Sequence, residues 1–102
     1  MLFSQLSEEI LPQIAKSAYN KGYSQFSVGD YKNAIDNLTK AFEYDDTNVD
    51  ALYYIGRSYQ YSNENAKAKK IYKQVIKNFP DNRRAVQAET NIAEMEEQAD
   101  EE

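Results

Sequence analysis

Apolar residues recur at three- and four-residue steps in five stretches of the chain, which is the spacing of amphipathic helices. We predict helices over residues 12–28, 31–44, 49–61, 65–78 and 83–98. Glycine, asparagine, aspartate and proline gather between these stretches, as expected of turns. Pro12 fits the first turn of the first helix, where its missing N–H is not needed. The pattern therefore predicts an all-α fold.

The special positions of the chain recur with a period of 34 residues. Gly22 coincides with Gly56 and Ala34 with Ala68. Five further pairs share this spacing: Tyr19/Tyr53, Gly29/Asn63, Leu38/Tyr72, Ala41/Val75 and Asn48/Asn82. A fixed period of this length is typical of stacked repeats, whose surfaces usually bind other proteins.

Two units, residues 15–48 and 49–82, resemble the tetratricopeptide repeat family. The first unit reads A-Y-N-K-G-Y and then G-D-Y-K-N-A-I, and the second reads L-Y-Y-I-G-R-S-Y and then N-E-N-A-K-A. Gly22 and Gly56 match the small residue of the family's first helix, and Ala34 and Ala68 match that of its second. The resemblance implies an α-solenoid of two antiparallel helix pairs, in which small residues let the helix backbones approach closely.

The stretch 83–98 has no predicted partner helix after it, so we interpret it as a capping helix that closes the open hydrophobic end of the solenoid. Its apolar stripe is Ala85, Ala88, Ile92 and Met95, and its polar face is Glu89, Asn91, Glu94, Glu96 and Glu97. The run A-V-Q-A-E-T-N-I-A-E-M is similar to the closing helix of bacterial cell-envelope proteins of the same family. Residues 99–102 form an acidic tail.

Some positions depart from the family pattern. Lys21 stands where the family prefers an aliphatic residue, and Gln25 stands where it prefers an aromatic one. Asp46 replaces the proline that Pro80 keeps in the second unit. Two of these three departures, Lys21 and Gln25, lie in the first predicted helix.

In this family the first helix of each pair lines a concave surface, so the resemblance implies a binding groove. The groove residues that it predicts are Lys16, Tyr19, Asn20, Tyr23, Tyr53, Tyr54, Arg57, Tyr61, Arg84, Gln87 and Asn91. The same mapping places Phe26 and Asp50 on this surface. Tyrosine and arginine dominate the hot spots of protein interfaces. Arg57, Arg84 and Lys16 favour a peptide that carries acidic side chains or a C-terminal carboxylate.

Packing is the alternative interpretation of the same tyrosines. Tyr19 and Tyr53 lie at positions that can pack between units, and Tyr31, Tyr44, Tyr59 and Tyr72 are interpreted as packing residues. Some family members clamp a terminal carboxylate with one lysine and two asparagines. Tyr19, Tyr23 and Tyr54 occupy those positions here, so that clamp is not expected.

The composition disfavours catalysis and nucleic-acid binding. The chain has no cysteine and no histidine, and it has no Gly-rich phosphate loop, so we expect no catalytic site, no metal and no cofactor. Asp45, Asp46, Asn48 and Asp50 are interpreted as helix-capping residues rather than a calcium site. The net charge is −5 and the isoelectric point is about 4.7, whereas nucleic-acid binding needs a dominant positive field.

The segment 1–11 carries Leu2, Phe3, Leu6, Ile10 and Leu11, and it has three open interpretations. It packs on its own domain, it pairs with a second copy in a homodimer, or it ends a longer helix from a membrane anchor or coiled coil. No run approaches the roughly 20 apolar residues of a membrane helix. We expect no insertion into the membrane, and a cytoplasmic location if the chain is whole or an extracytoplasmic one if it is anchored.

These patterns predict a non-catalytic protein-interaction module that binds a peptide or partner segment in a tyrosine-rich groove. A self-association module and an accessory domain of a membrane-anchored bacterial cell-envelope protein are the alternatives.

Overall fold

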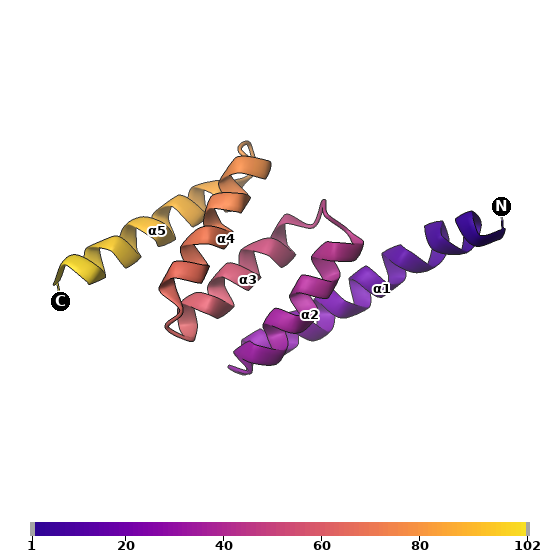
Figure 1. Cartoon of the computed structure of the whole chain (residues 1–102), viewed down its shortest axis with the longest axis horizontal. Helices are drawn as coiled ribbons and strands as arrows, with labels where there is room; N and C mark the ends of the chain where they lie inside the picture. The colour runs from indigo at the N-terminus through magenta and orange to yellow at the C-terminus, as the bar shows by residue number, and fades with distance from the viewer. Residues whose placement is uncertain (1, 102) are drawn as a thin grey trace.

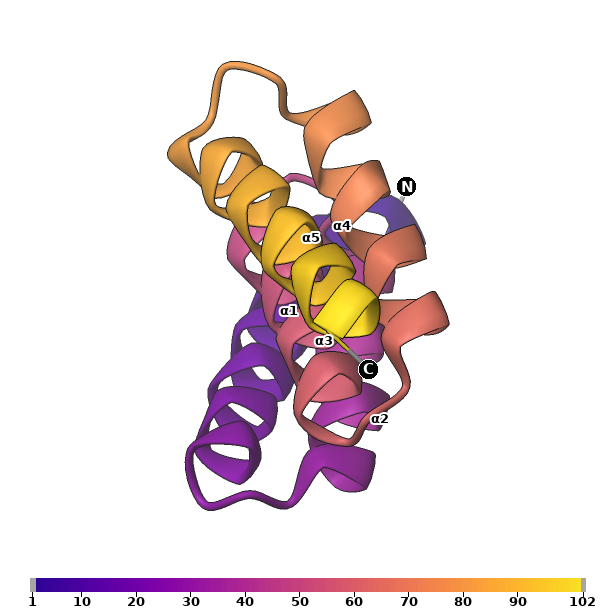
Figure 2. The same ribbon diagram turned by 90° about the vertical axis from the view of Figure 1, so that its left-hand side faces the viewer.

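Five helices follow one another in the computed structural model, which describes the backbone of residues 2–101 and the side chains of residues 8–99. The helices are α1 (Leu2–Ser27), α2 (Tyr31–Tyr44), α3 (Val49–Tyr61), α4 (Asn65–Asn78) and α5 (Arg83–Glu101). Each helix packs against the next, and the stack spreads along one axis (Figure 1, Figure 2). The prediction of an all-α solenoid is confirmed, and the bounds of α2, α3 and α4 agree with the sequence pattern.

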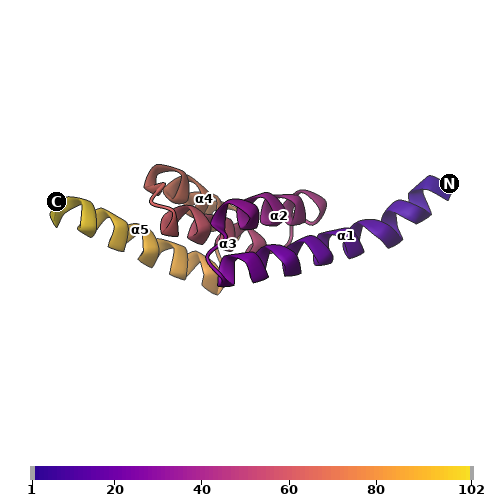
Figure 3. The ribbon, with the colours of Figure 1, turned by 90° about the horizontal axis from the view of Figure 1, so that it is seen from below.

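The helices form two layers. α1, α3 and α5 lie on one side of the stack, and α2 and α4 lie on the other (Figure 3). α3 contacts both α1 and α5, whereas α2 and α4 make no contact with each other within the described residues. Helices that converge line the inner side of a curved stack, so the inner face belongs to α1, α3 and α5.

The first helix differs from its predicted start. α1 begins at Leu2, and Pro12 lies inside it. The prediction that Pro12 occupies the first turn is therefore wrong. A proline in a helix interior costs about 3 kcal/mol, but apolar and helix-favouring residues continue upstream of Pro12 and support the helix there. The fifth helix also runs longer than predicted, to Glu101, because the acidic stretch after residue 93 consists of good helix formers.

The turns within the two helix pairs are built alike. Gly29 has φ 83° and Asn63 has φ 62°, and these are the two positive-φ residues of the described chain. After each, an amide N–H reaches back five residues: Asp30 N donates to the Gln25 carbonyl and Glu64 N to the Tyr59 carbonyl, both at 2.9 Å. This is the Schellman closure of a helix end, which needs a residue that tolerates the left-handed region.

Each helix pair crosses at a glycine. A Cβ placed on Gly22 would lie 2.7 Å from Leu38 Cγ, and one placed on Gly56 would lie 2.7 Å from Tyr72 Cε1. Both distances are shorter than a nonbonded carbon contact. The facing small residues, Ala34 and Ala68, are fully buried. The close approach that the resemblance implied is therefore present in both pairs.

The two departures in α1 have different surroundings. Lys21 is exposed, whereas Ile55, at the same position of the next unit, is buried in the core. Gln25 is half-buried and accepts a hydrogen bond from Asn37 Nδ2 at 2.8 Å, so it links α1 to α2 by a polar contact. Lys21 therefore meets water, where a charged side chain is favourable, whereas Gln25 is paired with a side chain of the next helix.

Candidate functional site

The inner face carries a side-chain stripe from each of its three helices. α1 presents Tyr19, Tyr23 and Phe26, which follow the three- and four-residue steps of one helix face. α3 presents Tyr54, Arg57 and Tyr61 at the same steps. α5 presents a third stripe from Arg84, Gln87 and Asn91. The solenoid geometry places these stripes next to one another because positions one period apart take equivalent places in successive units.

Aromatic contacts join the stripes of α1 and α3. The ring centroids of Tyr23 and Tyr54 are 5.1 Å apart in an edge-to-face arrangement. Phe26 lies 5.1 Å from Tyr54 and 5.9 Å from Tyr61. The first residue of α2, Tyr31, stacks on Tyr61 at 5.8 Å. These distances are in the favourable range for aromatic pairs, so the rings form one continuous cluster, named the aromatic face below.

The predicted groove residues divide by exposure. Tyr23 and Tyr61 keep 42% and 51% of their surface exposed. Lys16 and Asn20 are also exposed. The half-buried residues are Tyr19, Tyr54, Arg57, Arg84 and Gln87. Each of these residues therefore presents part of its side chain to solvent.

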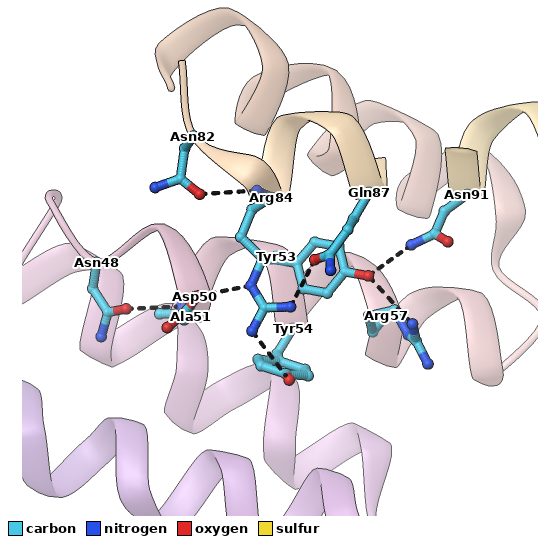
Figure 4. A network of polar contacts seen from close by, with 10 residues as sticks. All are labelled: Asn48, Asp50, Ala51, Tyr53, Tyr54, Arg57, Asn82, Arg84, Gln87 and Asn91. Atoms are coloured by element: carbon cyan, nitrogen blue, oxygen red, sulfur yellow. Dashed lines mark hydrogen bonds and ion pairs between the residues drawn. The ribbon is translucent and has the colours of Figure 1, made fainter. Parts of the chain in front are cut away.

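Two predicted groove residues lie beneath this surface. Tyr53 is 3% exposed and Asn91 is 9% exposed, so neither can touch a partner as the structure stands. Asn91 also does not belong to the polar outer face of the capping helix, contrary to the expectation. Its Nδ2 donates to Tyr53 Oη at 2.9 Å, across the junction of α5 and α3 (Figure 4). A buried amide is stable there because it is hydrogen-bonded. The prediction for Tyr44 is wrong in the opposite sense: it was expected to pack, but 43% of its surface is exposed.

Arg84 joins the capping helix to α3. Its Nε donates to Asp50 Oδ1 at 2.8 Å, and its guanidinium lies over the rings of Tyr53 and Tyr54 at 4.6 and 5.1 Å (Figure 4). A further bond from Nη1 reaches Gln87 Oε1 at 2.8 Å. Burial is the largest single influence and acts to lower the pKa of Arg84, but the bond to Asp50, the charge of Asp50 and the Tyr54 hydroxyl together outweigh it, so the pKa is raised. The charge of Arg84 is thus already matched by a carboxylate of the chain itself.

Arg57 has a different environment. Its Nη1 donates to Tyr53 Oη at 3.2 Å and its Nη2 to Tyr61 Oη at 2.6 Å, while its Cζ lies 4.9 Å from the Tyr61 ring centroid. Its Nε is buried without a hydrogen-bond partner. Burial is the largest single influence and acts to lower the pKa of Arg57, but the bond to Tyr53 and the nearby oxygens of Tyr61 and Tyr72 together outweigh it, so the pKa is raised. Among the residues whose side chains are described, the ion pairs are Lys67–Glu64 and Arg84–Asp50, so no carboxylate there neutralises Arg57.

Tyr19 lies at the edge of this face, beside the Asp50–Arg84 pair. Burial, followed by the nearby charge of Asp50, raises the pKa of Tyr19 from 10.0 to about 12. Tyr19 is therefore neutral at physiological pH and offers a phenol that can donate or accept.

Two contacts of the site were not predicted from the sequence. Asp50 was mapped to the groove by the family resemblance and also interpreted as a capping residue, but its pairing with Arg84, which follows it by one repeat period of 34 residues, was not predicted. That spacing, together with the opposite charges, was a signal that the two side chains meet. Tyr31 was assigned to packing, and only the structure shows that it extends the aromatic face through Tyr61. The described residues contain no cluster of His, Cys, Asp and Glu suited to a metal ion. The helices of residues 2–101 include none with both the length and the apolar character to span a membrane.

A model of the tetratricopeptide repeat family matches residues 25–92, which spans α2, α3, α4 and about half of α5. The match leaves out nearly all of α1, including Lys21. No curated protein matches the chain.

Proposed function

Because the chain belongs to the tetratricopeptide repeat family, whose members mediate protein–protein interactions, we propose that the aromatic face binds a peptide or extended segment of a partner protein. The observation that carries the proposal is the continuity of the face from Tyr23 on α1 to Tyr61 on α3. Both end residues are about half exposed, although nothing in the helix crossings requires a tyrosine at either position. A large aromatic surface held open to solvent is typical of an interface.

The rings suit binding energetically. A tyrosine carries a large apolar surface on few rotatable bonds, so little conformational entropy is lost when a partner covers it. Tyr23 and Tyr54 are already held by edge-to-face contact, and Tyr61 is held by Tyr31 and Arg57. Such a preorganised surface loses less free energy on binding than a mobile one.

The charges favour an acidic partner segment. Arg57 lies within the aromatic face and has no carboxylate neighbour among the described side chains, and exposed Lys16 lies on the same helix as Tyr23. A carboxylate on the partner can accept a charge-assisted hydrogen bond from Arg57 and balance its positive charge. The role is binding rather than catalysis, and it requires no cofactor.

Capture from cell lysate with matched variants tests the proposal. The bait is the wild-type chain beside Tyr23→Ala, Tyr54→Ala and Arg57→Ala in one triple variant, with helicity checked for each bait. Tyr44→Ala is the control, because Tyr44 and Tyr23 are exposed to 43% and 42% but Tyr44 lies at the end of α2, outside the aromatic face. Arg83→Ala controls for the loss of a positive charge, since Arg83 is exposed.

We expect a protein that the wild type and both controls retain and the triple variant loses. A true hot-spot residue contributes about 2 kcal/mol to binding, so loss of three should abolish retention. Equal retention by the triple variant would contradict binding at the aromatic face.

Self-association is the second candidate, and exposed apolar residues at the other end of the molecule favour it. Ile10, Leu11 and Tyr44 are all exposed, and Leu11, Pro12 and Tyr44 line a surface hollow of about 440 Å³ together with Glu8 and Asp45. Mass measured over a range of concentrations tests this candidate. A dimer that Ile10→Ser with Leu11→Ser disrupts and that Val28→Ser leaves intact would support it, since Val28 is an exposed valine in the turn after α1. A monomer at every concentration would contradict it.

A further inference from the structure

The capping helix reaches the aromatic face through one shared hydroxyl. Asn91 Nδ2 on α5 donates to Tyr53 Oη at 2.9 Å, and Arg57 Nη1 donates to the same oxygen at 3.2 Å (Figure 4). We propose that Asn91 is a positioning residue of the binding face: through Tyr53 it holds the Arg57 guanidinium in the orientation that receives a carboxylate of the partner. The proposal rests on the proposed function and assigns its charge recognition to one arginine.

Burial separates the positioning residues from the residue that they position. Tyr53 and Asn91 lie beneath the surface, whereas Arg57 keeps part of its surface exposed, so only Arg57 can meet a partner. An unsupported arginine side chain on a helix surface samples many rotamers, and fixing them on binding costs free energy. Bonds to two phenol oxygens, with Tyr53 itself held by Asn91, fix the guanidinium before the partner arrives.

The hydrogen-bond inventory leaves room for the carboxylate. A guanidinium carries five N–H groups. One at Nη1 reaches Tyr53, one at Nη2 reaches Tyr61, and the one at Nε is enclosed without a partner. The second hydrogen of each Nη remains, and these two can donate to the two oxygens of a carboxylate. A phenol oxygen has two acceptor positions and one hydrogen, so Tyr53, which already accepts from Arg57 and Asn91, has both acceptor positions filled.

The two arginines of the face therefore have separate tasks. Arg84 is 15% exposed and bonds to Asp50 of the same chain, so its charge serves the junction between α5 and α3. Arg57 has no such partner among the described side chains. The capping helix uses alanine and methionine at its other buried positions, Ala85, Ala88 and Met95. A buried amide at position 91 is costly unless it is bonded. Its Nδ2 donates to Tyr53, the tyrosine that holds Arg57, and the amide also lies within hydrogen-bonding reach of the Tyr72 hydroxyl.

Two variants interrupt the link from opposite ends. Asn91→Leu keeps the size of the side chain and removes the donor. Tyr53→Phe keeps the ring and removes the oxygen that Asn91 and Arg57 share. Each is also made in an Arg57→Ala background, because a residue that acts only through Arg57 loses its effect on binding when Arg57 is absent.

The probe is a peptide that contains one glutamate and is selected from a random library on the wild-type chain, paired with its twin in which glutamine replaces that glutamate. We expect Asn91→Leu and Tyr53→Phe each to weaken binding of the glutamate peptide about tenfold, the scale of one hydrogen bond to a charged group. Binding of the glutamine twin should change by less than about twofold, and neither substitution should weaken binding further in the Arg57→Ala background. Equal weakening of both peptides, or an undiminished effect without Arg57, would overturn the proposal and leave Asn91 a packing residue.

A ligand-free measurement keeps this test separate from that of the proposed function. In ¹⁵N-labelled protein we expect resolved Nη resonances for Arg57, because bonds to two phenols slow rotation of the guanidinium, and we expect Asn91→Leu to broaden or merge them. Unchanged resonances in Asn91→Leu would overturn the positioning role, whatever the peptides do. Failure of the library to yield a binder counts against the proposed function, and the guanidinium spectrum then decides the positioning role on its own.

Discussion

Replacing Gly56 with alanine sets two physical effects of opposite sign against each other. In a helix interior, alanine is favoured over glycine by about 1 kcal/mol. At the crossing of α3 and α4, however, the new Cβ would meet the Tyr72 ring at 2.7 and 2.8 Å. Tyr72 is fully buried and its hydroxyl donates to Gln60 Oε1 at 2.6 Å, so the ring has no free space to move into.

The steric effect should win. Overpacking of a well-filled core costs typically about 1–3 kcal/mol, and a contact this short with a rigid ring belongs near the upper end of that range. After the gain from helix propensity, we expect Gly56→Ala to lower the free energy of unfolding by about 1–2 kcal/mol. For a domain of this size that loss corresponds to a melting temperature lower by roughly 5–15 °C.

Urea unfolding followed by circular dichroism at a helical wavelength measures the effect. Thr90→Ala is the matched control, because Thr90 lies one repeat period after Gly56 but on α5, where its side chain is exposed. We expect that control to be neutral or slightly stabilising, since alanine has the higher helix propensity. Stabilisation by Gly56→Ala would refute the close crossing of α3 and α4 and with it the packing of the second repeat.

Three further predictions concern the turns, the capping helix and the response to pH. Gly29→Ala should cost about 1–2 kcal/mol because of its left-handed backbone alone, and Gly29→Asn should cost less, as thermal unfolding of the pair will show. Asp50→Asn should lower stability by at most about 1 kcal/mol, because the Asp50 side chain is 46% exposed, but it should speed hydrogen exchange in α5 through the loss of the Arg84 bond; unchanged exchange would contradict that role. Burial raises the pKa of Tyr19 to about 12, so above pH 10.0 the folded state keeps a proton that the unfolded chain has lost. The contribution of Tyr19 to the free energy of unfolding should therefore be fully present below pH 10.0 and be lost as the pH rises toward 12. When unfolding is measured over this range of pH, the free energy of unfolding of Tyr19→Phe should fall less steeply than that of the wild type.

The fold could be predicted because its constraints are local and repeated. Each local feature occurs twice at the same spacing of 34 residues: the crossing glycine, the positive-φ position and the apolar stripe. The occurrence of a feature in one unit therefore supports its assignment in the other. The start of α1 was the exception. Pro12 is a strong local signal for a helix start, and the wrong prediction shows that a continued helix-favouring sequence on both sides can outweigh the loss of one backbone hydrogen bond.

The candidate site was less predictable because exposure depends on the contacts between helices. The spacing alone places Tyr53 and Tyr54 on neighbouring sides of α3. Contacts with α4 and α5, through Tyr72 and Asn91, accompany the burial of Tyr53, whereas Tyr54 is half-buried. In the same way, Arg57 and Arg84 look equivalent in the sequence. Asp50 makes them different, because it neutralises one and leaves the other without a carboxylate.

Amide chemical-shift mapping of the ¹⁵N-labelled chain, with a captured partner segment as ligand, tests binding at the aromatic face most directly. The largest shift changes should gather at Tyr23, Arg57 and Tyr61 and on their neighbours along α1 and α3. Changes gathered instead on the outer surfaces of α2 and α4, or around Leu11 and Tyr44, would contradict the aromatic face as the binding surface.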